Sequence, residues 1–184
     1  MNAEFLACDN EKRSILLNET DALITDIRGI CICVQTADCV PVFLFDKTKN
    51  AVGIIHAGWR GTAQLIVKKT IEAMQKYYHC DPADLIAGIG PSIGPEVYEV
   101  SAEVADVFLN VYPTAADAIL KPSRHGHAML NLWEANRLQL IGSGVPAASV
   151  EVSGICTFQN HEEFYSSRKN NGHTGRFANG IMLK

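Results

Sequence analysis

Two short apolar runs on either side of a polar turn constrain the fold of this chain more than any other feature. Residues 40–45 and 51–55 flank a turn at residues 46–50. Short apolar runs bounded by turn residues are typical of β-strands rather than helices. We therefore predict a β-hairpin, which brings the residues before its first strand close to those after its second.

Four side chains that could take part in catalysis or bind a ligand flank this predicted hairpin. Asp38 and Cys39 stand just before its first strand. His56 ends its second strand, and Arg60 follows in a Gly-Trp-Arg-Gly turn. We expect a carboxylate, a thiol, an imidazole and a guanidinium to meet at one corner of the sheet. Two interpretations of Cys39 and His56 stay open: ligands of a catalytic zinc ion, or a thiolate–imidazole pair for nucleophilic attack.

Composition narrows the class of protein. The 184 residues suit one domain that buries a sizeable core. A net charge of −4 argues against a general nucleic-acid binder. Six cysteines without a C-x-x-C pair indicate neither a zinc cluster nor a disulfide framework. No signal sequence or membrane-length apolar stretch is present, so we expect a cytoplasmic protein that does not contact a membrane.

The remaining apolar patterns predict a mixed α+β fold. We expect strands at residues 21–25, 30–35, 85–89, 150–155 and 177–183, and helices at residues 101–111 and 130–141. A further helix opens at residues 61–62 and ends before Asp81. The strand at residues 30–35 is apolar on both faces, which predicts a central strand covered on both sides. Cys31 and Cys33 lie two residues apart on it, so they face the same way and pack as small hydrophobic residues.

Three arginines are candidates for contacts with an anion. Arg60 lies between two glycines at the predicted helix start, where free backbone amides attract negative charge. Arg168 and Arg176 flank a segment rich in Gly and Asn. Taken alone, such charges near a chain end are usually solvated.

Six motifs resemble those of one known family and occur in the family's order. They are Thr-Ala-Asp-Cys-Val-Pro-Val at residues 36–42, His-Ala-Gly-Trp-Arg-Gly-Thr at 56–62, Gly-Pro-Ser-Ile-Gly-Pro at 90–95 with Tyr-Glu-Val at 98–100, Cys-Thr at 156–157, Phe-Tyr-Ser-Ser-Arg at 164–168 and Thr-Gly-Arg at 174–176. They are similar to motifs of the YfiH family, also called the multicopper polyphenol oxidase (laccase) family. The resemblance implies a single α+β domain over residues 1–184, with layered mixed sheets and helices packed outside.

The resemblance also implies a function. Members are described as purine nucleoside phosphorylases that act on adenosine, inosine, guanosine and methylthioadenosine, with adenosine deaminase activity in the same pocket. Their metal, usually assigned as zinc, is held by one Cys and two His; the matching positions here are Cys39 and His56. With Asp38 and Arg60, these are the candidate catalytic residues. Arg60, Arg168 and Arg176 are the candidate ligands of nucleoside or phosphate.

One departure from the family pattern concerns the metal. The family's first histidine ligand lies in a Gln-Val-His-Gly motif, but no histidine precedes His56 in this sequence, and the segment before residue 21 is short. Two ligands hold zinc poorly, so we expect weak metal binding and impaired activity. Two alternatives remain: a copper-dependent polyphenol oxidase, disfavoured because the six histidines are scattered, and a non-catalytic domain that binds a partner or forms oligomers.

Overall fold

A five-stranded mixed sheet forms the centre of the fold. The computed structural model describes residues 5–8, 14–17, 19–124 and 126–184. The strand order is β11-β7-β5-β6-β3, with only β11 and β7 parallel. The strands are β3 (Ala22–Thr25), β5 (Val40–Asp46), β6 (Ala51–Ala57), β7 (Leu85–Ile89) and β11 (Val150–Val152). The predicted hairpin is confirmed: β5 and β6 pair antiparallel, with Pro41 opposite His56.

A four-stranded antiparallel sheet covers one face of the central sheet. Its order is β12-β4-β1-β2, formed by β1 (Phe5–Cys8), β2 (Ser14–Leu17), β4 (Cys31–Thr36) and β12 (Phe177–Met182). Buried Ile32 and Val34 of β4 pack with Val52 and Ile54 of β6. The prediction that β4 is covered on both faces is wrong. Burial alternates along the strand, and its other face, which carries Cys31, is only half-buried.

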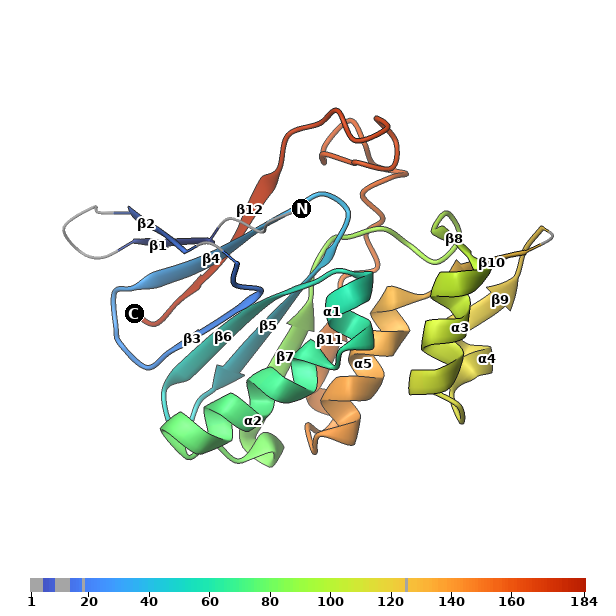
Figure 1. Ribbon diagram of the computed structural model, residues 1–184. Coiled ribbons are helices and arrows are strands. Elements are labelled where there is room, and N and C mark those ends of the chain that lie inside the picture. The colour runs from blue at the N-terminus through green and yellow to red at the C-terminus, as the bar shows by residue number, and fades with distance from the viewer. Residues whose placement is uncertain (1–4, 9–13, 18, 125) are drawn as a thin grey trace.

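Helices cover the opposite face of the central sheet (Figure 1). They are α1 (Trp59–Ala63), α2 (Ile66–Tyr78) and α5 (Leu132–Gly142). Because successive residues of a strand point to opposite faces, Ile54 meets the four-stranded sheet while Ile55 joins the core under the helices. This two-sided burial explains why β6 reads as an unbroken apolar run.

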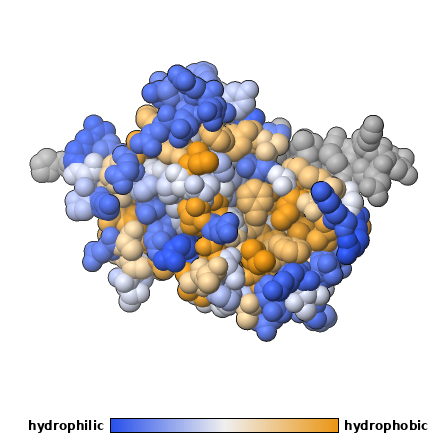
Figure 2. Space-filling model, turned by 180° about the vertical axis from the view of Figure 1, so that it is seen from behind, coloured by the Kyte–Doolittle hydropathy of each residue, from blue (hydrophilic) through white to orange (hydrophobic). Residues whose placement is uncertain are grey.

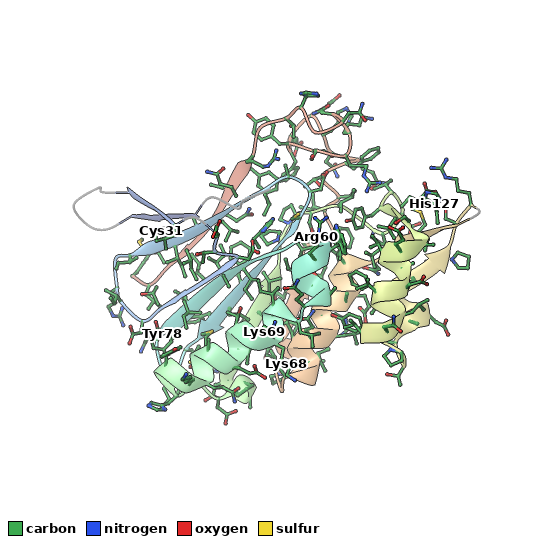
Figure 3. All side chains as sticks on the ribbon, viewed as in Figure 1. Cys31, Arg60, Lys68, Lys69, Tyr78 and His127 are labelled. Atoms are coloured by element: carbon green, nitrogen blue, oxygen red, sulfur yellow. The ribbon has the colours of Figure 1, made fainter. Side chains whose placement is uncertain are left out.

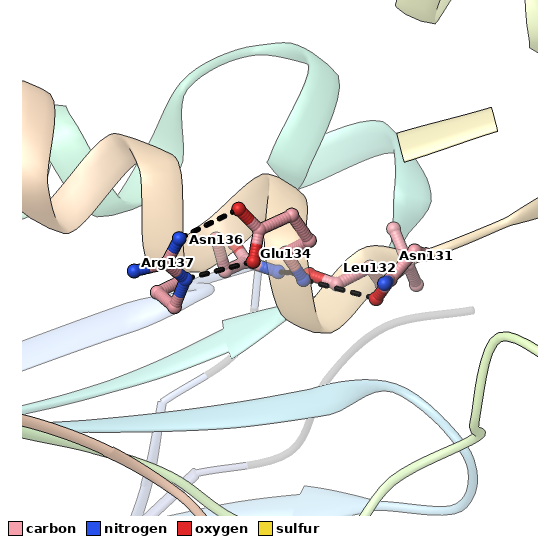
Figure 4. Close-up of polar contacts among 5 residues, drawn as sticks. All are labelled: Asn131, Leu132, Glu134, Asn136 and Arg137. Atoms are coloured by element: carbon pink, nitrogen blue, oxygen red, sulfur yellow. Dashed lines mark hydrogen bonds and ion pairs between the residues drawn. The ribbon is translucent and has the colours of Figure 1, made fainter. Parts of the chain in front are cut away.

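The predicted helix from residues 61–62 starts earlier and is broken. It begins at Trp59, and Leu65, with φ +60°, separates α1 from α2. The helix predicted at residues 130–141 is also shifted, because Leu130 belongs to a strand. Asn131 caps α5 by accepting a hydrogen bond from the Glu134 amide at 3.0 Å (Figure 4). Arg137 then forms an ion pair with Glu134 at 2.7 Å.

A small third sheet lies beside these layers. Its order is β8-β10-β9, with β8 (Glu99–Ser101), β9 (Leu120–Pro122) and β10 (His127–Leu130). Helices α3 (Ala102–Val111) and α4 (Ala116–Ile119) accompany it, and 3₁₀ turns occur at Pro82–Asp84 and Ala147–Ser149. The whole is an α+β fold of layered sheets, as expected. Hydrophobic and hydrophilic residues are interspersed over the face seen in Figure 2, and none of the described helices is long and apolar enough to cross a membrane.

Candidate functional site

The hairpin brings Cys39 and His56 to the same corner, as predicted. A Cβ atom added to Gly58 would lie 3.0 Å from Cys39 Sγ and 3.9 Å from His56 Cε1. Both side chains therefore converge on one point beside the Gly58 backbone. Gly58 is also the N-cap residue of α1, the helix that carries Arg60. The absence of a side chain at Gly58 thus leaves room for the Cys39 thiol at the point where this helix begins.

Asp21 orients the ring of His56 from the neighbouring strand. Its Oδ1 atom lies 2.9 Å from His56 Nδ1. Burial, the largest influence, lowers the pKa of His56, but the hydrogen bonds and charges of Cys39 and Asp21 outweigh it and raise that pKa to about 9. In this arrangement the imidazole is protonated at neutral pH. Sequence reasoning gave Asp21 no role, although antiparallel pairing of β3 with β6, with Ala22 opposite Ile55, places residue 21 beside residue 56.

A pocket of about 510 Å³ opens at this corner. Its lining includes Cys39, His56, Arg60, Tyr98 and Arg168. The remaining lining residues are Asp21, Ala37, Asp38, Gly58, Trp59, Gly61, Ile93, Leu132, Ser167, Asn171 and Gly172. The Arg60 guanidinium lies over the Trp59 ring, 4.5 Å from its centroid. Two guanidinium groups and an indole thus surround one concave space.

Asp38 joins the start of β5 to the C-terminal loop. Its carboxylate is buried, with Oδ1 accepting a hydrogen bond from Thr157 Oγ1 and Oδ2 from the Arg168 backbone amide, both at 2.7 Å. Because each oxygen is already engaged, this carboxylate is suited to hold the loop rather than to exchange a proton with a ligand. The hydrogen bond to the amide fixes the backbone that carries the Arg168 side chain.

Tyr98 completes the support of Arg168. The Arg168 guanidinium donates to the Glu99 carbonyl oxygen at 2.9 Å and lies over the Tyr98 ring, 5.0 Å from its centroid. Burial raises the pKa of Tyr98 to about 12, so its hydroxyl stays protonated and can donate a hydrogen bond. Tyr98 lies in the matched motif region, but sequence reasoning gave it no role.

Arg176 contacts the backbone of its own loop. Its guanidinium donates to the carbonyl oxygens of Thr174 and Gly175 at 3.2 and 2.8 Å. It is not among the described residues that line the pocket. Its contact with a substrate stays a prediction.

The buried side chain of Gln139, on α5, connects the end of α1 to the start of α2 beneath the pocket. Gln139 Oε1 accepts hydrogen bonds from the backbone amides of Val67 and Lys68, which start α2. Its Nε2 atom donates to the Thr62 carbonyl at 2.8 Å and contacts the Tyr112 hydroxyl at 2.6 Å. The α1–α2 break is therefore capped by a side chain of α5. Since α1 has only five residues, positive charge at its start comes mainly from the Arg60 guanidinium.

The residues present supply an incomplete metal site. Cys39 and His56 are suitable zinc ligands, and Asp21 is the kind of carboxylate that orients a ligating histidine. A catalytic zinc ion takes three protein ligands. Across the described part of the chain, no group of three or more His, Cys, Asp or Glu side chains is arranged to hold a metal ion. The donor set therefore does not fit a complete catalytic zinc site.

Comparison with known proteins shows that this chain is similar to proteins named as enzymes. The chain is 40% identical over 179 residues to a purine nucleoside phosphorylase of Bacteroides thetaiotaomicron, covering 97% of this chain and 66% of the relative. It is 37% identical over 185 residues to adenosine deaminase RL5 from an unknown prokaryotic organism, covering 100% of this chain and 70% of the relative. The chain thus spans about two thirds of the length of these relatives.

A solved structure and a family model agree with these similarities. The crystal structure of the Bacillus licheniformis hypothetical protein YfiH superposes with a TM-score of 0.87 at 38% identity, covering 90% of this chain and 62% of that one. Residues 2–184 match the family model described as multi-copper polyphenol oxidoreductase laccase. The chain therefore belongs to the multi-copper polyphenol oxidoreductase laccase family, as its resemblance to YfiH proteins indicated.

Proposed function

We propose that this chain forms the nucleoside- and phosphate-binding part of a purine nucleoside phosphorylase. The observation that carries the proposal is the convergence of Arg60 and Arg168 on the pocket that also contains Cys39 and His56. Phosphate needs fixed positive charge, and guanidinium groups match its oxygen atoms geometrically. Relatives named purine nucleoside phosphorylase and adenosine deaminase support an enzymatic role for this pocket.

In the proposed reaction, a phosphate oxygen forms a bond to the anomeric carbon of the ribose while the bond to the purine nitrogen breaks. The electron pair of that bond leaves with the purine, which then takes up a proton. Arg60 and Arg168 hold the phosphate, and the Trp59 ring offers a surface for stacking the base. His56, with its pKa of about 9, is the proton donor for the leaving purine.

Asp38 is assigned a positioning role in this proposal. Its two hydrogen bonds keep the Arg168 backbone and Thr157 together at the edge of the pocket. A guanidinium held in place before phosphate arrives loses less conformational freedom on binding. Deamination of adenosine in the same pocket, the second activity carried by the resemblance, would need a water activated by a metal held at Cys39 and His56. Cys39 and His56 supply two of the three protein ligands that such a metal takes.

The test measures phosphate-dependent release of base. The full chain is incubated with adenosine, inosine, guanosine or methylthioadenosine, with and without inorganic phosphate, and the products are separated by chromatography. We expect free purine only when phosphate is present. Folded protein that releases no base from any of the four nucleosides would refute the proposal. Appearance of inosine without phosphate would instead indicate deamination.

Two variants test the role assigned to Arg168. A hydrogen bond to a charged group contributes about 1.5–3 kcal/mol, so Arg168→Gln is expected to raise the KM for phosphate about tenfold or more. Lys169→Gln is the matched control, because Lys169 is an exposed cation next in the chain that lies over Phe158, outside the pocket lining. Equal effects of the two substitutions would show that only general positive charge matters.

A further inference from the structure

Two thiols meet on the outer face of the four-stranded sheet, away from the pocket. The Sγ atoms of Cys31 and Cys33 lie 3.4 Å apart, and both residues are half-buried. Cys31 starts β4, whereas Thr36, at the other end of the strand, leads toward Cys39. Five residues of extended chain span roughly 16 Å. Figure 3 accordingly shows Cys31 well separated from Arg60.

The neighbouring strand leaves room for both sulfur atoms. Gly180 of β12 lies opposite Cys33, and Met182 lies opposite Cys31. A Cβ atom on Gly180 would be 2.9 Å from Cys33 Sγ, closer than real Cβ atoms come, and 3.1 Å from Cys31 Sγ, a tight contact. Both thiols therefore converge above the one position on this part of β12 that has no side chain.

Met182 adds a third sulfur-containing side chain to the same face. Directly opposed residues of antiparallel strands share a face, with Cβ atoms about 4.5–5.5 Å apart. Met182 is 44% exposed, so its thioether is not committed to the core. The core contacts of these strands lie on the other face, where Ile32 and Ile181 pack toward the central sheet. The three sulfur-containing side chains therefore lie together on the face that does not meet the central sheet.

The distance between the thiols favours a shared metal ion over a disulfide. A disulfide bond is about 2.05 Å long, so forming one would require the sulfurs to close by more than 1 Å. Two metal–sulfur bonds of about 2.3 Å at a tetrahedral angle span about 3.8 Å. The observed 3.4 Å is close to that span, and a small rotation of either side chain reaches it.

The chemistry of the three side chains selects the metal. Thiolate and thioether sulfurs are soft ligands, which favour Cu(I) over the hard cations that carboxylates bind. We infer that Cys31 and Cys33, with Met182 as a weaker third ligand, form a binding site for one soft metal ion, with Cu(I) the best match. This site is independent of the Cys39/His56 corner and of the proposed phosphorylase activity.

A competition titration tests the site. The full chain carries Cys39→Ser, so that the pocket no longer offers a thiol, and is titrated anaerobically with Cu(I) against a chromophoric Cu(I) chelator. We expect one Cu(I) per chain, with the ultraviolet charge-transfer band of copper–thiolate bonds. Loss of an outer partner of a metal site alone costs about 10–100-fold in affinity. Loss of a ligand, in Cys31→Ser or Cys33→Ser, is therefore expected to cost at least about 100-fold.

Two further variants keep both thiols and make the test independent of serine substitution. Gly180→Ala places a methyl group where the sulfurs converge and is expected to weaken Cu(I) binding, whereas Met182→Leu removes only the thioether and is expected to weaken it less. Circular dichroism checks that each variant is folded. Unchanged affinity in both single-cysteine variants, or full binding in the Cys31→Ser/Cys33→Ser double variant, would overturn the inference.

Discussion

Removing the Asp38 carboxylate is expected to destabilise the protein by about 3–5 kcal/mol. The carboxylate is buried and accepts two short hydrogen bonds, one from Thr157 Oγ1 and one from the Arg168 amide. Hydrogen bonds to charged groups contribute about 1.5–3 kcal/mol each, and a buried donor left without a partner adds to the cost. Asp38→Ala loses both bonds and leaves the fully buried Thr157 hydroxyl without its acceptor.

Asp38→Asn is expected to cost less, about 1–2 kcal/mol, because its amide oxygen still accepts one of the two hydrogen bonds. Urea unfolding measures both variants, and hydrogen exchange at the Arg168 amide reports whether the loop has been released. Asp81→Ala is the control: Asp81 is exposed and accepts one hydrogen bond, from the Ala83 amide at 3.0 Å, so its loss should cost about 1 kcal/mol or less. An Asp38→Ala protein as stable as the Asp81→Ala control, with unchanged exchange at Arg168, would refute the reasoning.

Three other predictions concern Gln139, Tyr112 and Arg168. Gln139→Leu leaves two backbone amides of α2 without an acceptor and should lower the free energy of unfolding, measured by urea titration, by about 2–3 kcal/mol. The control is Gln75→Leu on the exposed face of α2, which should change that free energy by about 0.5 kcal/mol or less. Equal costs would contradict the capping role of Gln139. Burial raises the pKa of Tyr112 to about 12, above its unfolded value of 10. The stability that the protonated hydroxyl contributes is therefore present below pH 10 and is lost as pH rises toward 12. Tyr112→Phe should flatten this part of the curve of unfolding free energy against pH, and an unchanged curve would contradict the prediction. Arg168→Lys keeps the charge but not the planar fork, so phosphate KM should rise by about threefold to tenfold; a KM equal to that of wild type would argue against a fork-shaped contact.

Several features of the fold follow from patterns within a few residues of one another. The turn at residues 46–50 and the apolar runs beside it predict the hairpin of β5 and β6, and pairing within a hairpin then places Cys39 beside His56. The two-residue spacing of Cys31 and Cys33 predicts that they share a face, which the 3.4 Å contact confirms. Each inference needs only the period of a strand and the geometry of a short turn.

Other features depend on packing between segments that are far apart in the chain. The break at Leu65 has no local cause in propensity; the structure stabilises it by a cap from Gln139 on α5. The half-exposed face of β4 could not be predicted either, because an apolar run does not reveal which of its faces another layer covers.

The sequence by itself determined the family, the α+β class, the hairpin and the corner at which Cys39 and His56 meet, because local periodicity and motif spacing encode these. Only the tertiary structure decided that Asp38 holds a loop, since its partners lie 119 and 130 residues away along the chain. Likewise, Asp21 reaches His56 only through the pairing of β3 with β6. Such contacts are set by how the layers pack, and packing depends on the whole chain at once.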